Sequence, residues 1–142
     1  MLTEKDYCDY ETCVALKELG YNQYTSLRRY AGKGGVRLWD FDGEPNYKEG
    51  ELIALSDMYD IPRDGNEVAA PSLYEAQKWL REVKKVIIVI VPYTYNIITE
   101  TSTWTYEIWL EDNLEREVHD FKTYEEALSE GVRASIKMLK EK

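Results

Sequence analysis

The chain has 142 residues, with 18 basic and 27 acidic side chains and a net charge of −9. This length fits one domain, so we expect residues 1–142 to form a single domain. Within it, residues 1–70 form a helix, hairpin and loop region, and residues 71–142 form a second region. The first region holds 8 basic and 14 acidic side chains and the second 10 and 13. Since neither region is basic, binding to a nucleic-acid backbone is disfavoured.

The first region begins with a short helix, expected from Asp9 to Leu19. Asp9 can cap its start and Gly20 can close its end in a left-handed conformation. A glycine-rich loop at 32–35 precedes a strand at 36–41, and Asp42-Gly43 is typical of a tight hairpin turn. The return arm is weak because Pro45 limits ladder hydrogen bonds, and residues 56–71 are expected to be loop.

Two capping boxes organise the second region. Ser72 and Glu75 begin one helix, and Thr123 and Glu126 begin the last. Strands are expected at 86–98, 103–110 and 114–121. The sequence therefore predicts an α+β fold, in which an antiparallel three-stranded sheet carries two helices on one face. The order is helix–strand–strand–strand–helix, preceded by a helix and a weak β-hairpin.

The hydrophobic pattern predicts a register for the first hairpin of this sheet. With a loop at 99–102, one face would pair Ile97 with Trp104, Tyr95 with Tyr106, Tyr93 with Ile108 and Val91 with Leu110. We expect this face to be the core. Six residues should be largely buried there, namely Trp79, Leu80, Tyr95, Tyr106, Leu128 and Val132.

The opposite face of the predicted sheet carries an apolar patch formed by Ile88, Ile90, Pro92 and Trp109. Contiguous exposed apolar patches tend to mark interaction sites, so these four residues are a possible interface, with Trp109 as its anchor. Two covers stay open: the N-terminal half of the chain, or a partner protein or second copy. The 12 Tyr and 4 Trp of the chain suit either a small core or a binding surface.

No residue pattern indicates catalysis, a cofactor or a metal ion. His119 is the only histidine, and no nucleophile is predicted beside it. The segment 40–44 resembles a calcium loop but has strand-like flanks. Cys8 and Cys13 lack further metal ligands nearby and are expected to be structural or free thiols. An enzyme remains an option only if His119 lines a cleft with two carboxylates.

The chain lacks the segments that would send it to a membrane. Residues 1–6 contain no apolar signal core, and the longest aliphatic run, Val86–Val91, is far shorter than the roughly 20 residues that span a bilayer. Two unpaired cysteines suit a reducing compartment. We therefore expect a cytoplasmic protein with no membrane contact.

Three segments resemble one family. They are Ala70-Pro71-Ser72-Leu73 through Gln77 to Glu82, Glu11-Thr12 with Leu16 to Tyr21, and Thr123 to Leu128. In this order they resemble small uncharacterised proteins of prophages and mobile elements in gut Bacteroidetes. That family has no assigned activity, so the resemblance implies an origin and a compartment, and no mechanism.

These observations predict a non-enzymatic accessory protein of a phage or mobile element, which acts by binding an unidentified protein or by self-association. The alternative is a nucleic-acid-binding or regulatory protein, because the helix–strand–strand–strand–helix order is also that of double-stranded RNA-binding domains. Those domains need basic groups where the last helix begins. Here that position carries Glu125 and Glu126, whereas Lys137, Lys140 and Lys142 lie at the far end.

Overall fold

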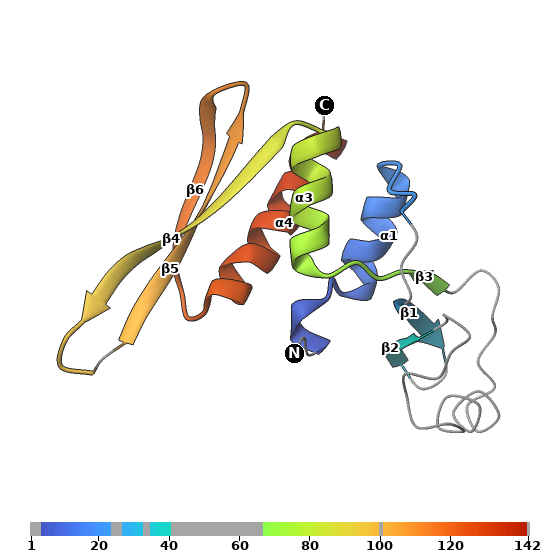
Figure 1. The fold of residues 1–142 in the computed structure, drawn as a ribbon, viewed down its shortest axis with the longest axis horizontal. Helices are drawn as coiled ribbons and strands as arrows, with labels where there is room; N and C mark the ends of the chain where they lie inside the picture. Colours follow the sequence, from blue (N-terminus) through green and yellow to red (C-terminus); the bar gives the residue numbers. More distant parts are fainter. Residues whose placement is uncertain (1–3, 24–26, 33–34, 41–66, 100, 142) are drawn as a thin grey trace. The chain divides into compact units, whose positions relative to one another are not determined.

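The computed structural model describes residues 4–23, 27–32, 35–40, 67–99 and 101–141 (Figure 1). It divides into two compact units, Met1–Pro71 and Ser72–Lys142. The boundary between them lies within a residue or two of the predicted boundary between the two regions.

The first unit combines short helices with a small sheet. A 3-10 helix, η1 (Glu4–Asp6), precedes helix α1 (Tyr10–Glu18). Strands β1 (Leu27–Gly32), β2 (Gly35–Asp40) and β3 (Glu67–Ala69) form an antiparallel sheet in the order β2-β1-β3. Helix α1 contacts β1 and β3.

The predicted ends of α1 are confirmed. The side chain of Asp9 accepts a hydrogen bond from the Thr12 N–H at 2.8 Å. At the other end Gly20 has a φ of 104°, and the N–H groups of Gly20 and Tyr21 donate to the carbonyls of Lys17 and Leu16. This is a Schellman motif, which satisfies the last carbonyls of the helix.

The first unit contains a hairpin between β1 and β2 that was not predicted. The strand expected at 36–41 is present as β2, but it pairs with the preceding strand β1, with Gly32 opposite Gly35. Gly32 and Gly35 are the paired residues at the end of this hairpin. The segment 41–66, with Asp42-Gly43 and Pro45, lies outside the described residues.

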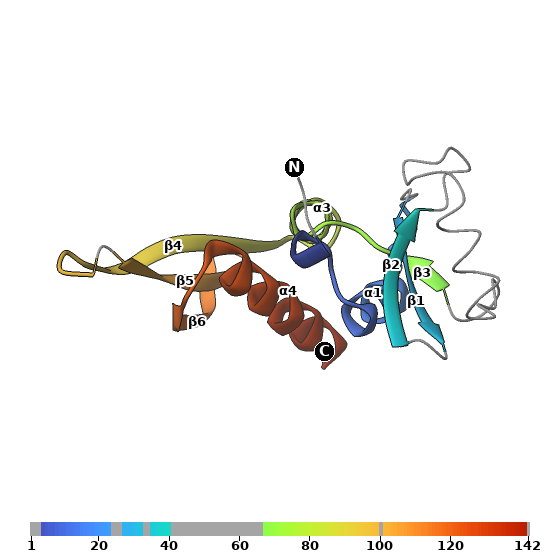
Figure 2. The same cartoon turned by 90° about the horizontal axis from the view of Figure 1, so that it is seen from below.

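The second unit has the predicted α+β architecture. Helix α3 (Leu73–Val83) is followed by strands β4 (Val86–Asn96), β5 (Thr101–Leu110) and β6 (Asn113–Phe121) and by helix α4 (Tyr124–Lys140). The strands form one antiparallel sheet in the order β4-β5-β6. Both helices lie on the same face of this sheet, and the tip of the β4–β5 hairpin projects beyond them (Figures 1 and 2).

Local signals set the ends of these helices and strands. Ser72 and Glu75 form the predicted capping box, with bonds of 3.1 and 2.9 Å. At α4 the Thr123 hydroxyl accepts from the Glu126 N–H at 3.0 Å, which is one of the two bonds of the predicted box. Between β5 and β6, Glu111 and Asp112 have φ of 50° and 67°. Two successive positive φ angles indicate a type I′ turn, which matches the twist of antiparallel strands.

The core of this unit lies between the helices and the sheet. Trp79, Leu80, Tyr106, Leu128 and Val132 are buried there, as predicted. The side chain of Tyr95 lies outside the described part of the structure. The remaining buried apolar residues of the two helices and the sheet are Leu73, Ala76, Val86, Ile88, Ile108, Leu110, Ala127 and Ile136.

The predicted register of the β4–β5 hairpin was wrong. Asn96 pairs with Thr101 rather than Thr105, a displacement of four residues. An even displacement keeps every side chain on its face. A bulge between Pro92 and Thr94 then adds one residue, so Val91 lies opposite Thr105 instead of Leu110. This odd displacement turns the base of β4 over, and Ile88 and Ile90 face Ile108 and Tyr106.

Helix α4 lies unusually close to the sheet at Gly131. A Cβ atom at this position would meet Ile88 Cγ2 at 2.9 Å and Tyr106 Cβ at 3.3 Å. Both neighbours are themselves buried, so neither can move aside without disturbing the core. The glycine therefore sets the distance between the helix and strands β4 and β5.

We expect Gly131→Ala to lower the free energy of unfolding by about 1–3 kcal/mol, because overpacking outweighs the roughly 1 kcal/mol that alanine gains in a helix. Urea denaturation followed by circular dichroism measures this difference. Ser129→Ala, two residues earlier in α4, is the matched control and should be neutral or slightly stabilising. A stabilising Gly131→Ala would contradict the close contact.

Candidate functional site

The four residues of the predicted interface do not share a face. Ile88 is only 5% exposed and lies beneath Gly131 of α4. Ile90 pairs with Tyr106 and Pro92 with Trp104, on the helix-covered face, whereas Trp109 pairs with Ile87 and points away from the helices. The predicted patch is therefore wrong as a set, because the bulge between Pro92 and Thr94 turns the base of β4 over. Trp109 alone remains on the open face.

Trp109 lies in a different apolar row on that open face. It pairs with Ile87 of β4 on one side and with Leu114 of β6 on the other. Ile87 is 46% exposed and Leu114 43%, while Trp109 is half-buried between them. Sequence reasoning missed Ile87 and Leu114. The unbroken run Val86–Val91 was the available signal, since it supplies apolar side chains to both faces of the strand.

A polar row lies beside the apolar one. The Thr105 hydroxyl and His119 Nδ1 are 2.7 Å apart, and His119 Nε2 is 3.0 Å from Glu117 Oε1. Tyr93 stacks on the His119 ring at a centroid distance of 4.0 Å. Because a carboxylate only accepts, the neutral ring carries its proton on Nε2, and Nδ1 accepts from the Thr105 hydroxyl.

This row resembles a hydroxyl–imidazole–carboxylate triad but lacks the properties of one. Thr105 is 1% exposed, so its oxygen is closed to a substrate. The ring is also reversed, because in hydrolase triads Nε2 faces the hydroxyl and Nδ1 faces the carboxylate. Glu107 pairs with Glu117 across the strands, but the described cleft of this unit lies on the other side of the sheet. The row therefore fixes side chains on the open face and offers no accessible nucleophile.

The charge of the open face has one sign. Glu107 and Glu117 are cross-strand neighbours there, and Glu107 accepts a hydrogen bond from Trp109 Nε1 at 3.1 Å. The three strands contain a single Lys or Arg, Arg116, and it projects to the helix side. The open face of β4–β5–β6 is therefore apolar and acidic, with no Lys or Arg from its strands.

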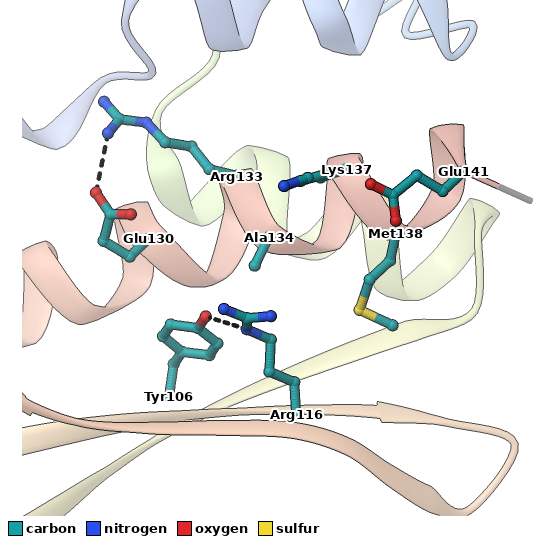
Figure 3. A pocket seen from close by; sticks show the side chains of 8 residues that line it. All are labelled: Tyr106, Arg116, Glu130, Arg133, Ala134, Lys137, Met138 and Glu141. Carbon is teal, nitrogen blue, oxygen red and sulfur yellow. Dashed lines mark hydrogen bonds and ion pairs between the residues drawn. The ribbon is translucent and has the colours of Figure 1, made fainter.

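The helix side holds a cleft between β6 and α4 (Figure 3). Its volume is about 320 Å³, and it is lined by Tyr106, Arg116, Glu130, Arg133, Ala134, Lys137, Met138 and Glu141. The cleft contains three cations and two carboxylates. Arg133 pairs with Glu130 at 2.9 Å, and Arg116 Nε donates to the Tyr106 hydroxyl at 2.8 Å.

The described residues show neither a cluster of metal ligands nor a membrane-spanning helix. Within the described ranges, no three His, Cys, Asp or Glu side chains come together to hold a metal ion. Cys8 and Cys13 are buried and are not joined by a disulfide, and the Cys13 thiol donates to the Cys8 carbonyl at 3.5 Å. None of the described helices has the length and apolar character needed to span a bilayer.

Comparison with known proteins adds no relative. The chain matches no protein-family model, and no curated protein or solved structure shows significant similarity to it.

The polar row yields a prediction about coupling. Replacing Thr105 by Val keeps the shape but removes the hydroxyl, and replacing His119 by Phe keeps a ring on Tyr93 but removes the acceptor. In a double-mutant cycle we expect the two changes to be coupled by about 0.5–1.5 kcal/mol in the free energy of unfolding. Denaturant titration of the four proteins measures the coupling. Strictly additive effects would show that the contact contributes nothing.

Proposed function

We propose that this protein acts by binding another protein, without catalysis, through the open face of the β4–β5–β6 sheet. The docking face consists of Ile87, Tyr93, Trp109 and Leu114, flanked by Glu107 and Glu117. The single observation that carries the proposal is the exposed row of Ile87, Trp109 and Leu114 on a face that neither α3 nor α4 covers. Exposed apolar rows with a central Trp are typical of interfaces.

The chemistry of the docking face specifies the partner. Its apolar row requires apolar side chains opposite, and its two glutamates require cations. A second copy fits poorly, because a two-fold dimer formed by this face would bring like carboxylates together in a chain of net charge −9. We therefore infer a partner surface that combines apolar residues with Lys or Arg.

The biological setting is part of the same proposal. The resemblance of three segments to proteins of prophages and mobile elements supports an accessory role in such an element, inside the bacterial cell. Small accessory proteins of this kind can act by occupying a surface of a larger protein, which needs no active site.

Nucleic-acid binding is the second candidate, because the order α3-β4-β5-β6-α4 is that of double-stranded RNA-binding domains. The charges oppose it. Glu125 and Glu126 lie in the first turn of α4, where those domains place basic groups, and Tyr74 of α3 bonds to Glu125 at 3.4 Å. The β4–β5 hairpin tip offers Ile97 and Ile98, which are exposed and apolar.

We expect affinity capture from cells that encode the protein to recover a partner with wild type and to lose it with Trp109→Ser. Val83→Ser is the matched control, since Val83 is exposed but lies at the end of α3. Recovery should also fall with rising salt, because charge pairs at the rim are screened.

Three results would contradict the proposal. They are capture without a reproducible partner, recovery of the same proteins with Trp109→Ser as with wild type, and loss of recovery after nuclease treatment. The last result would favour the nucleic-acid alternative. Circular dichroism of each variant checks that the fold is retained.

A further inference from the structure

We propose that the cleft between β6 and α4 binds the carboxylate group of a small organic acid. This cleft lies on the helix side of the sheet, so the proposal is independent of the docking face. It rests on the placement of Arg116, Tyr106 and Lys137 (Figure 3).

Arg116 is held so that its outer nitrogens stay available. Its Nε donates to the Tyr106 hydroxyl at 2.8 Å, which fixes the plane of the guanidinium group. Among the described residues, no carboxylate lies within ion-pair distance of this group. Figure 3 shows the guanidinium between β6 and the underside of α4. A fixed guanidinium with both outer nitrogens available binds a carboxylate through two parallel hydrogen bonds.

Tyr106 supplies a second donor. This residue is 3% exposed, and its hydroxyl oxygen accepts the bond from Arg116. Its own O–H has no acceptor within the part of the chain that the structure describes. A buried donor without an acceptor costs free energy, and an oxygen of a ligand in the cleft would remove that cost.

The charge of the cleft selects a singly charged group. Lys137 projects from α4 with no carboxylate within ion-pair distance among the described residues, whereas Arg133 is paired with Glu130. With Glu130 and Glu141 also on the rim, the cleft has an excess of one positive charge. A monoanionic carboxylate neutralises this excess, whereas a dianionic phosphate would leave the cleft with a net negative charge beside the two glutamates.

A smaller part of the lining is apolar. The Tyr106 ring, Ala134 and Met138 line the cleft beside the charged groups, and its volume of about 320 Å³ lies within the range of small-ligand sites. The ligand class is therefore a carboxylate attached to a compact apolar group.

Benzoate is a suitable probe, with benzyl alcohol as the uncharged control and inorganic phosphate as the dianion. We expect saturable shifts of the amide signals of Arg116 and Lys137 in two-dimensional NMR, with a dissociation constant of about 1–10 mM for benzoate. Benzyl alcohol should produce no saturable shift, and phosphate should bind more weakly than benzoate.

Variants of the full chain identify the donors. Arg116→Gln should weaken benzoate binding by about 10-fold or more, and Arg116→Lys should weaken it less, because the charge remains but the paired donors are lost. Arg81→Gln, on the exposed side of α3, should bind like wild type. The NMR spectrum of each variant confirms its fold.

Four results would overturn the proposal: no saturable shift with benzoate, equal binding of benzyl alcohol, tighter binding of phosphate than of benzoate, or unchanged binding by Arg116→Gln. None of them bears on the docking face, whose test uses Trp109.

Discussion

Residue Gly131 has no side chain to hold α4 away from the sheet, so the helix rests directly on Ile88 and Tyr106. This contact commits the face that carries Ile88 and Tyr106 to the core. Since successive side chains of a strand point to opposite faces, Ile87 and Trp109 must then point away from the helices. The open face and its apolar row follow from that one packing contact.

The two sides of the sheet differ in charge, and the helices cover only one of them. The strands contain one Arg and no Lys, and Arg116 projects toward α4, where it lines the cleft with Lys137. The open side keeps Glu107, Glu117 and the apolar row. One small sheet thus carries a cationic cleft on its helix side and an acidic, apolar row on its open side. These two surfaces use different residues, so binding at one need not interfere with binding at the other.

The features that the sequence predicted well are local ones. The capping box of Ser72 and Glu75 depends on residues three positions apart, and the α+β order depends on the periodicity of each segment. Trp109 was correctly placed on a face opposite Tyr106, because both lie on one regular strand. These relationships do not depend on how the strands pair.

The features that the sequence did not predict depend on pairing between strands. No turn residue in the sequence indicates the bulge between Pro92 and Thr94. This bulge nevertheless moves Ile88 and Ile90 from the predicted interface to the core. The contact between Thr105 and His119 needs a second irregularity on β6, where Asp120 has a φ of 75°. The cleft is similar, because Arg116 and Lys137 meet only when α4 folds back over β6.

The central claim is that the register of β4 and β5 places Trp109 between Ile87 and Leu114 on the open face. The most direct test is the set of nuclear Overhauser contacts from the Trp109 indole ring in the free protein. Side chains directly opposite one another have Cβ atoms about 5 Å apart, well within the range of this measurement. We predict contacts from the indole to the methyl groups of Ile87 and Leu114. Contacts to Pro92 in place of Ile87 would support the register expected from the sequence, in which Pro92 pairs with Trp109, and would contradict the account.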